Sequence, residues 1–261
     1  MSLPSVAVVI PFFRSEPLWY EQIAIQQAIN VLGNYPHLIV APASLSLSHL
    51  QHWYQHHPAG FSCIRVPDHY FESTASYNRL ILDAGFYQQL SDYTFHLIYQ
   101  TDAYIFRDEL AHWCQQGFDY VGAPWLDWIH AARQAKNLNR WNQLMWRLGK
   151  RRFDAVGNGG FSLRKTASII SLLTTLEAEA RSYTHNEDFF FAFEARKYGK
   201  GLNIPDVSEA LHFAFDENPE LAWTMNKQQL PMGCHAWPKN WNFWKPFIKM
   251  GNNMAIDNPI G

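Results

Sequence analysis

A single carboxylate, Asp102, stands where a strand ends. It follows an apolar and aromatic segment, residues 95–99, with the composition of a buried strand in a largely parallel sheet. Ligands of open α/β sheets bind beyond the carboxyl ends of the strands, where an acid can hold a divalent cation and the cation a diphosphate. Alternatively, Asp102 opens a turn or caps a helix that begins near residues 107–109. The residue alone leaves both roles open.

Two further acids, Glu187 and Asp188, follow Asn186 at the start of an aromatic segment. Asn186 has the type of a helix N-cap, and acids are favoured in a first helical turn because they interact with the helix dipole. That is a complete structural explanation of both carboxylates. The same placement would also hold a general base rigidly at the mouth of a site.

Arg79 and the glycines of residues 157–160 are weaker signals. A guanidinium matches phosphate oxygens in a bidentate manner, but a surface ion pair explains a lone arginine better. The glycines let the backbone approach a ligand closely. They neither form a GxGxxG motif nor follow the first strand, so we do not expect a dinucleotide.

The elements around these residues predict an α/β fold. Short apolar strands at 6–10, 37–41 and 61–66 alternate with helices at about 18–33 and 45–56, which is the doubly wound pattern with right-handed crossovers. Further helices are expected from about residue 73 to 90 and from 166 to 180. No repeat or low-complexity linker interrupts the chain, so we expect one domain.

Composition narrows the class of protein. The 261 residues carry 21 basic and 23 acidic side chains, a net charge of −2, which gives no field to recruit nucleic acid. Aromatic residues make up 16% of the chain, which fits a carbohydrate-handling protein, an aromatic core or a membrane-contacting surface. Three separated cysteines indicate a reducing compartment. We see no signal peptide and no spanning segment, and therefore expect a cytoplasmic protein.

Residues 139–152 combine tryptophans with basic residues. As a helix, this segment would place Trp141, Leu144, Met145 and Leu148 on one face, flanked by arginines and lysines. Such a helix either packs its apolar stripe on the domain, which we favour, or lies in a membrane interface.

Four of these segments, in this order, resemble motifs of GT-A-type glycosyltransferases. Residues 76–86 resemble the FNR helix of galactosyltransferases, residues 100–102 the DxD motif, 157–160 the glycine-rich loop and 186–188 the xED motif. Almost the whole chain, roughly residues 5–240, is also similar to an uncharacterised, mostly bacterial family of glycosyltransferase-like proteins.

The resemblance implies a Rossmann-like GT-A fold with a mostly parallel central sheet flanked by helices and a more irregular C-terminal half. It also implies one GT-A-like domain over residues 1–261, of which about 1–125 bind the nucleotide sugar and about 126–261 the acceptor. The implied reaction moves a sugar from a nucleotide-diphosphate sugar to a hydroxyl of a glycan or lipid-linked acceptor, with inversion and metal assistance, in surface polysaccharide synthesis. The protein would then work in the cytoplasm or at the inner face of the membrane, held by peripheral contact through residues 139–152.

Site residues follow from the same resemblance. The implied donor-site residues are Pro11, Arg14, Asn78, Arg79, Gln100, Asp102, Gly159 and Gly160. Asp102 and His235 would hold the metal, Asp188 would be the catalytic base assisted by Glu187, and Trp125 with Glu187 would shape the acceptor pocket.

One departure from the DxD motif matters, because Gln100 replaces its first acid. The cation, Mn²⁺ or Mg²⁺, would then rely on diphosphate oxygens and water, so we expect weak or dispensable metal binding. Two other functions stay open. A sugar nucleotidyltransferase usually has a glycine-rich basic loop after its first strand, and residues 11–15 contain no glycine. A catalytically inactive sugar-binding module would explain Gln100 as a lost acid.

Overall fold

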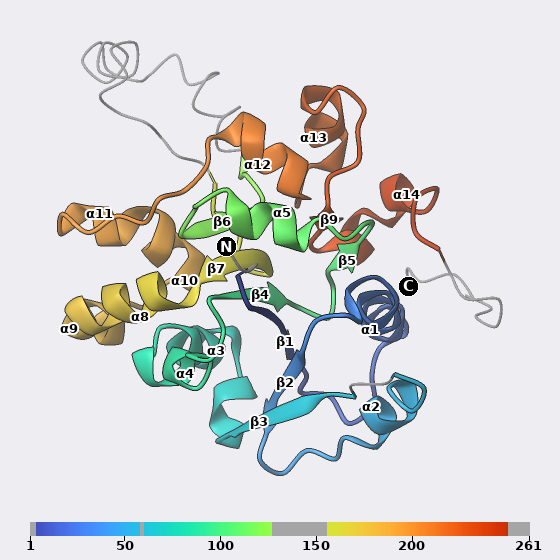
Figure 1. The fold of residues 1–261 in the computed structure, drawn as a ribbon, viewed down its shortest axis with the longest axis horizontal. Helices are drawn as coiled ribbons and strands as arrows, with labels where there is room; N and C mark the ends of the chain where they lie inside the picture. The colour runs from blue at the N-terminus through green and yellow to red at the C-terminus, as the bar shows by residue number, and fades with distance from the viewer. Residues whose placement is uncertain (1–3, 58–59, 127–155, 250–261) are drawn as a thin grey trace.

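A computed structural model describes residues 4–57, 60–126 and 156–249. Its centre is a six-stranded sheet in the order β3-β2-β1-β4-β7-β6 (Figure 1). The strands are β1 (Val6–Pro11), β2 (His37–Pro42), β3 (Ser62–Val66), β4 (Phe95–Tyr99), β6 (Tyr120–Gly122) and β7 (Phe161–Lys165). All are parallel in direction except β7, which runs antiparallel to both of its neighbours. The predicted mostly parallel α/β sheet is confirmed.

Both faces of this sheet are buried, as the apolar strands predict. Successive residues of β1 alternate between two hydrophobic clusters: Val8 and Ile10 belong to one, Ala7 and Val9 to the other. Helices α1 (Trp19–Leu32), α2 (Ser48–Trp53) and α5 (Leu110–Gln115) cover the first face. The second is covered by α3 (Thr74–Ile81), α4 (Ala84–Gln88), α8 (Thr166–Thr175) and α9 (Glu177–Ser182).

Three predicted helices have different bounds. The helix expected to run to residue 90 is divided into α3 and α4, because Asp83 starts a new helix: its side chain accepts a hydrogen bond from the N–H of Gly85 at 2.9 Å. The helix expected over residues 45–56 is the shorter α2. The helix expected over residues 166–180 is divided into α8 and α9 near Leu176.

The C-terminal part adds a three-stranded sheet in the order β5-β9-β8. It is built from β5 (Tyr104–Ile105), β9 (Gly233–Cys234) and β8 (Ala214–Phe215). The pairing of β5 with β9 brings the end of β4 beside residue 235, which determines the site described below.

Around this small sheet lie short helices and an aromatic core. The helices are α12 (Val207–Phe213), α13 (Pro219–Met225) and α14 (Trp241–Trp244), with the 3₁₀ turn η3 (Trp237–Asn240). A second 3₁₀ turn, η1 (Asp68–Phe71), lies beside β2 of the main sheet and beside α3. Trp237 and Trp244 are fully buried. The residues of this core therefore account for part of the high aromatic content of the sequence.

One helical segment near the second face of the main sheet changes from α-helical to π-helical geometry in its middle. It consists of α10 (Glu187–Phe189), the π-helical η2 (Phe190–Glu194) and α11 (Ala195–Lys197).

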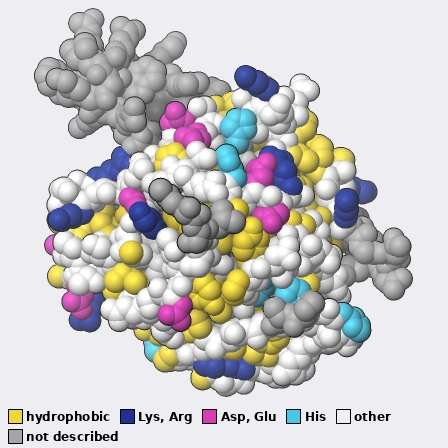
Figure 2. All heavy atoms as spheres, in the orientation of Figure 1, with side chains coloured by type: hydrophobic (Ala, Val, Ile, Leu, Met, Phe, Trp, Pro, Cys, Tyr) yellow, Lys and Arg dark blue, Asp and Glu magenta, His cyan; other side chains and the backbone are white. Residues whose placement is uncertain are grey.

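On the face shown in Figure 2, acidic and basic side chains are interspersed, in agreement with the net charge of −2. Within the described ranges, no helix has the length and apolar character needed to cross a membrane. The predicted amphipathic segment 139–152 lies outside these ranges.

Candidate functional site

The glycine-rich residues 157–160, here called the glycine loop, lie between two groups of polar side chains. A Cβ atom at Gly159 would overlap Oε1 of Glu187, and one at Gly160 would overlap Nε2 of His235. The carbonyl of Gly160 also accepts a hydrogen bond from the backbone N–H of Gln100 at 2.9 Å. Glycine is thus required for close approach at both positions, and the loop holds the two groups side by side.

The first group, here called the His235 corner, is a chain of hydrogen bonds ending at the predicted Asp102. Nδ1 of His235 lies 3.1 Å from Oδ1 of Asp216, and Oδ2 of Asp216 accepts a hydrogen bond from Nδ2 of Asn158 at 2.7 Å. On the other side of the ring, Nε2 lies 3.1 Å from Oδ1 of Asp102 and 3.2 Å from Oε1 of Gln100. The structure therefore brings together the two predicted metal ligands and Gln100.

Two carboxylates beside His235 determine its charge. Burial lowers the pKa of His235, but the charges and hydrogen bonds of Asp102 and Asp216 outweigh this effect and raise the pKa to about 10. Burial likewise raises the pKa of Asp102, and the charge of His235 more than compensates, so that the pKa of Asp102 is lowered. Without a metal, the corner holds an imidazolium between two carboxylates.

These side chains also fit a hard divalent cation. Among the described residues, no three His, Cys, Asp or Glu side chains form a metal-binding group, so a third protein ligand would be the amide oxygen of Gln100. Two ligands at right angles, each about 2.1 Å from Mg²⁺, would be about 3 Å apart. The observed Nε2 distances of 3.1 Å to Asp102 and 3.2 Å to Gln100 match that spacing. Asp216 would hold the outer N–H of His235, as carboxylates do behind many metal-bound histidines.

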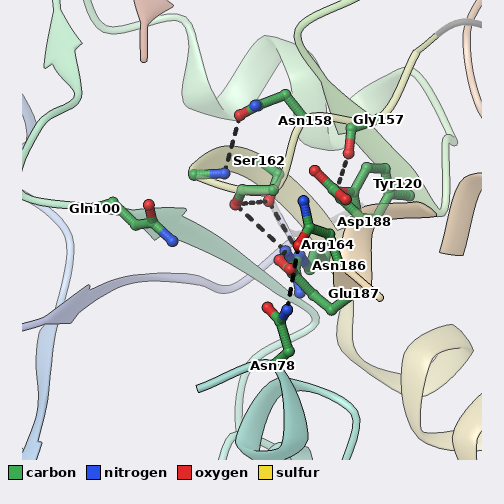
Figure 3. Close-up of polar contacts among 12 residues, drawn as sticks. Asn78, Gln100, Tyr120, Gly157, Asn158, Ser162, Arg164, Asn186, Glu187 and Asp188 are labelled. Carbon is green, nitrogen blue, oxygen red and sulfur yellow. Dashed lines mark hydrogen bonds and ion pairs between the residues drawn. The ribbon is translucent and has the colours of Figure 1, made fainter. Parts of the chain in front are cut away.

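The second group, here called the carboxylate pair, consists of Glu187 and Asp188 in the first turn of α10. Both are buried, with 7% and 8% of their surface exposed. Asn186 occupies the predicted N-cap position but its side chain makes no capping hydrogen bond. Its Oδ1 instead accepts a hydrogen bond from Nδ2 of Asn78 in α3, at 3.4 Å. This contact ties the pair to the neighbouring helix (Figure 3).

Glu187 has a fully buried cationic partner, Arg164, at the end of β7. Nη2 of Arg164 lies 3.3 Å from Oε1 of Glu187 (Figure 3). Nη1 of Arg164 donates to the hydroxyl of Tyr87 at 2.7 Å. The guanidinium also lies over the rings of Tyr120 and Phe191, 5.1 Å from each centroid. The ion pair therefore holds the Glu187 carboxylate in place beside β7.

Asp188 forms no ion pair with a described residue, and Arg164 acts on it only as one of the weaker charges. Burial and then the negative charge of Glu187 raise the pKa of Asp188 to about 7. The backbone N–H of Phe189 donates to its Oδ1 at 2.7 Å and opposes this shift only in part. A carboxylate with a pKa near neutral pH is suited to accept a proton.

A cavity of about 420 Å³ opens beside these groups at the carboxyl ends of β1 and β4. It is lined by the loop after β1, the start of α1, the segment from η1 into α3, and the end of β4. The lining residues are Pro11, Phe13, Arg14, Tyr20, Glu21, Phe71, Glu72, Ser73, Thr74, Tyr77, Gln100, Thr101 and Asp102. Four predicted donor-site residues, Pro11, Arg14, Gln100 and Asp102, are among them.

The sequence model of a family described as a protein of unknown function (DUF5672) matches residues 60–235. The chain belongs to the DUF5672 family. No curated protein matches the DUF5672 chain by sequence.

Solved structures similar to this DUF5672 protein are glycosyltransferases. The Mn/GDP form of core-mannan synthase A from Aspergillus fumigatus has a TM-score of 0.50 at 12% identity, over 77% of this chain and 72% of that one. Mouse xyloside xylosyltransferase 1 has a TM-score of 0.52 at 10% identity, over 88% and 97% of the two chains. The bifunctional glycosyltransferase WbbM has a TM-score of 0.54 at 13% identity, over 89% of this chain but only 45% of its own. These matches establish a shared fold, which is the fold predicted from the sequence.

Four predicted donor-site residues of the DUF5672 protein do not line the cavity: Gly159 and Gly160 of the glycine loop, and Asn78 and Arg79 of α3. Arg79 is exposed and does not line it. Residues two positions apart on a helix point in nearly opposite directions, and Tyr77 is the one that lines the cavity. Asn78 is buried and bonds to Asn186 and to the carbonyl of His185. The structure thus gives a donor-binding role for Arg79 and Asn78 no support.

Trp125, predicted to stack on a sugar of the acceptor, stacks on other aromatic residues. Its ring lies 4.7 Å from that of Phe189 at an interplanar angle of 20°, and 5.7 Å from that of Phe193 at 27°. All three residues are half-buried. Since Phe189 directly follows Asp188, this aromatic cluster lies near the carboxylate pair, and a ligand would meet the cluster rather than an isolated ring.

Proposed function

We propose that this DUF5672 protein transfers a glycosyl group from a nucleotide-diphosphate sugar to a hydroxyl of a glycan or glycolipid acceptor. The observation that carries the proposal is Asp188, a buried carboxylate with a pKa of about 7, beside the Glu187 carboxylate and across the glycine loop from the His235 corner. A transferase needs such a base on one side of the reacting carbon and positive charge on the other. The fold that the chain shares with solved glycosyltransferases also supports this assignment.

The donor half of the site is the cavity between β1 and β4. Arg14 is half-exposed on one wall and forms an ion pair with Glu21 at 3.4 Å, so it can turn to a phosphate oxygen. Asp102, Gln100 and His235 would hold a divalent cation, Mn²⁺ or Mg²⁺, which when bound stabilises negative charge on the departing diphosphate. Gly159 and Gly160 would contribute by letting Glu187 and His235 approach the loop backbone closely.

The acceptor half lies beside α10. In the reaction, Asp188 removes the proton from the acceptor hydroxyl while the oxygen attacks the anomeric carbon and the bond to the diphosphate breaks. Attack from the side opposite the leaving group inverts the configuration. Glu187, held by Arg164, places its carboxylate beside Asp188, where its charge raises the pKa of Asp188. Trp125 and its two phenylalanine neighbours would form the apolar wall of the acceptor site.

Three finer parts of the proposal rest on the sequence alone. These are a role in surface polysaccharide synthesis, a division into a donor half at about 1–125 and an acceptor half at about 126–261, and peripheral membrane contact through 139–152 from the cytoplasmic side. Co-sedimentation with anionic liposomes at low and high salt tests the membrane contact, because binding through basic residues is lost at high salt.

A turnover assay separates this function from its two rivals. Incubation with UDP- and GDP-linked hexoses, Mn²⁺ and saccharide acceptors should release nucleoside diphosphate, and Asp188→Asn should stop this release. Release of pyrophosphate from a nucleoside triphosphate and a sugar 1-phosphate would instead identify a nucleotidyltransferase. Donor binding in calorimetry without release of any product, by transfer or hydrolysis, would identify an inactive sugar-binding module.

A further inference from the structure

The wall of the donor cavity contains a buried phenol hydroxyl that makes no well-formed hydrogen bond. Tyr77 lines the cavity from α3, and among the described residues no group reaches the distance and angle of a hydrogen bond to its hydroxyl oxygen, although the Gln100 side chain is close enough to act on its pKa. Burial raises the pKa of this phenol, so that it stays protonated and can donate. A buried hydroxyl without a partner costs free energy, and in a cavity a ligand is the group that can remove this cost.

The position of Tyr77 indicates which part of a ligand would reach it. The Gln100 side chain is a near neighbour, and both Glu187 and Arg164 are close enough to affect the phenol electrostatically. α3 is also tied to α10 through the bond between Asn78 and Asn186. Tyr77 therefore lies on the side of the cavity that faces the carboxylate pair.

The two ends of a nucleotide-diphosphate sugar differ in charge. Near Tyr77 the charge of Arg164 is already paired with Glu187, so a phosphate would gain little there, whereas a neutral sugar hydroxyl needs no cation. The groups that would receive a diphosphate, Arg14 and the His235 corner, belong to other parts of the site. The charge distribution favours the sugar as the partner of Tyr77.

We propose that the Tyr77 hydroxyl donates a hydrogen bond to a hydroxyl of the transferred sugar, and that Tyr77 thereby determines which sugar the protein accepts. This inference rests on the proposed function. A site that hydrogen-bonds a substrate hydroxyl discriminates strongly against an analogue without it, because the protein group is then left unpaired.

The test compares Tyr77→Phe with the native protein, using the hexose donor that turns over in the assay above. Phenylalanine keeps the ring and its contact with Phe71, 5.9 Å away between centroids, so the fold should be retained. We expect KM for the donor to rise about tenfold, a typical effect of a lost ligand hydrogen bond. The calorimetric Kd of the free nucleoside diphosphate should stay within about threefold. Tyr70→Phe, which removes a phenol hydroxyl from the neighbouring η1, is the matched control and should change neither value.

Monodeoxy analogues of the same donor identify the hydroxyl concerned. The native protein should discriminate against one of them, and Tyr77→Phe should lose that discrimination alone. An unchanged KM with discrimination retained would overturn the inference and leave the proposed function standing. A weaker Kd for the nucleoside diphosphate would also overturn it, since Tyr77 would then contact the diphosphate. If the native protein turns over no donor, the proposed function fails, and the inference with it.

Discussion

Two acids of the site, Asp102 and Asp188, are of the same type and have opposite surroundings. Asp102 lies 3.1 Å from the imidazolium of His235, whose charge lowers its pKa, while burial and the Glu187 carboxylate raise the pKa of Asp188 to about 7. A cationic neighbour keeps one aspartate ionised, and an anionic neighbour makes the other a proton acceptor. The neighbouring charges, rather than the residue type, therefore determine the two roles. Asp102 is an anion that holds positive charge, and Asp188 is a base.

Replacing the proton acceptor should have the largest effect. Asp188→Asn keeps the shape of the side chain and removes its basicity, so we expect kcat to fall by at least about 10²-fold. The Kd of the donor should change little, because Asp188 does not line the donor cavity. Single-turnover kinetics with calorimetry measures both quantities. Retention of kcat within a few-fold would remove Asp188 from the role of base.

The His235 corner should respond in binding rather than in proton transfer. Asp102→Asn should remove the Mn²⁺-dependent part of nucleoside diphosphate affinity, and Asp216→Asn should weaken it by about 10- to 100-fold, as expected when the partner of a metal-bound histidine is changed. Calorimetry with and without Mn²⁺ measures this part directly. Equal Mn²⁺ dependence in the native protein and in Asp102→Asn would contradict the metal assignment.

Exchanging the anionic neighbour should turn Asp188 into a carboxylate more like Asp102. Glu187→Gln removes a negative charge beside Asp188 and should lower its pKa. Since the base must be deprotonated to act, the rise of kcat/KM with pH, expected near pH 7 in the native protein, should move to lower pH. Glu194→Gln, seven residues along the same helical segment, is the matched control. An unshifted acid limb in Glu187→Gln would show that Glu187 does not control the titration.

The smallest effect concerns the backbone that presents His235. Ala236 has φ 51° and ψ 29°, the left-handed region that glycine adopts more readily than alanine. The carboxylate pair, by contrast, begins at Asn186 with an ordinary φ of −64°. Ala236→Gly should therefore increase the free energy of unfolding by up to about 1 kcal/mol, less the entropy that glycine adds to the unfolded chain. Urea unfolding measures the change, and a loss of stability would contradict the presence of strain.

The sequence predicted the large sheet well and the small one not at all. β1, β2 and β4 lie within about a residue of their predicted bounds, because continuous apolar segments identify buried strands. The strands β5, β8 and β9 have two residues each, too few for any periodicity to be visible. For this reason the meeting of Asp102 with His235 came from the family resemblance, and no local pattern predicted it.

Three residues of the site were not identified from the sequence: Asp216, Arg164 and Tyr77. Asp216 and Arg164 were not predicted, because isolated charged residues are usually exposed. A signal for Arg164 was available: Ser162 and Arg164 alternate with Phe161 and Leu163 on a strand in a sheet with two buried faces, so both polar residues require buried partners. Arg79 was proposed from its residue type and from the resemblance, without regard to which face of the helix would line the cavity; Tyr77 lies on that face.

The glycine loop has a consequence for the evolution of new donor preferences. Gly159 and Gly160 leave no room for a side chain, and each is pressed against a different half of the reaction centre. In a saturation-mutagenesis library, variants at these two positions would be depleted whichever sugar was selected for. Ser73 and Thr74 line the same cavity, are exposed, and contact neither half. Libraries intended to broaden donor scope should vary that rim and keep the glycines fixed.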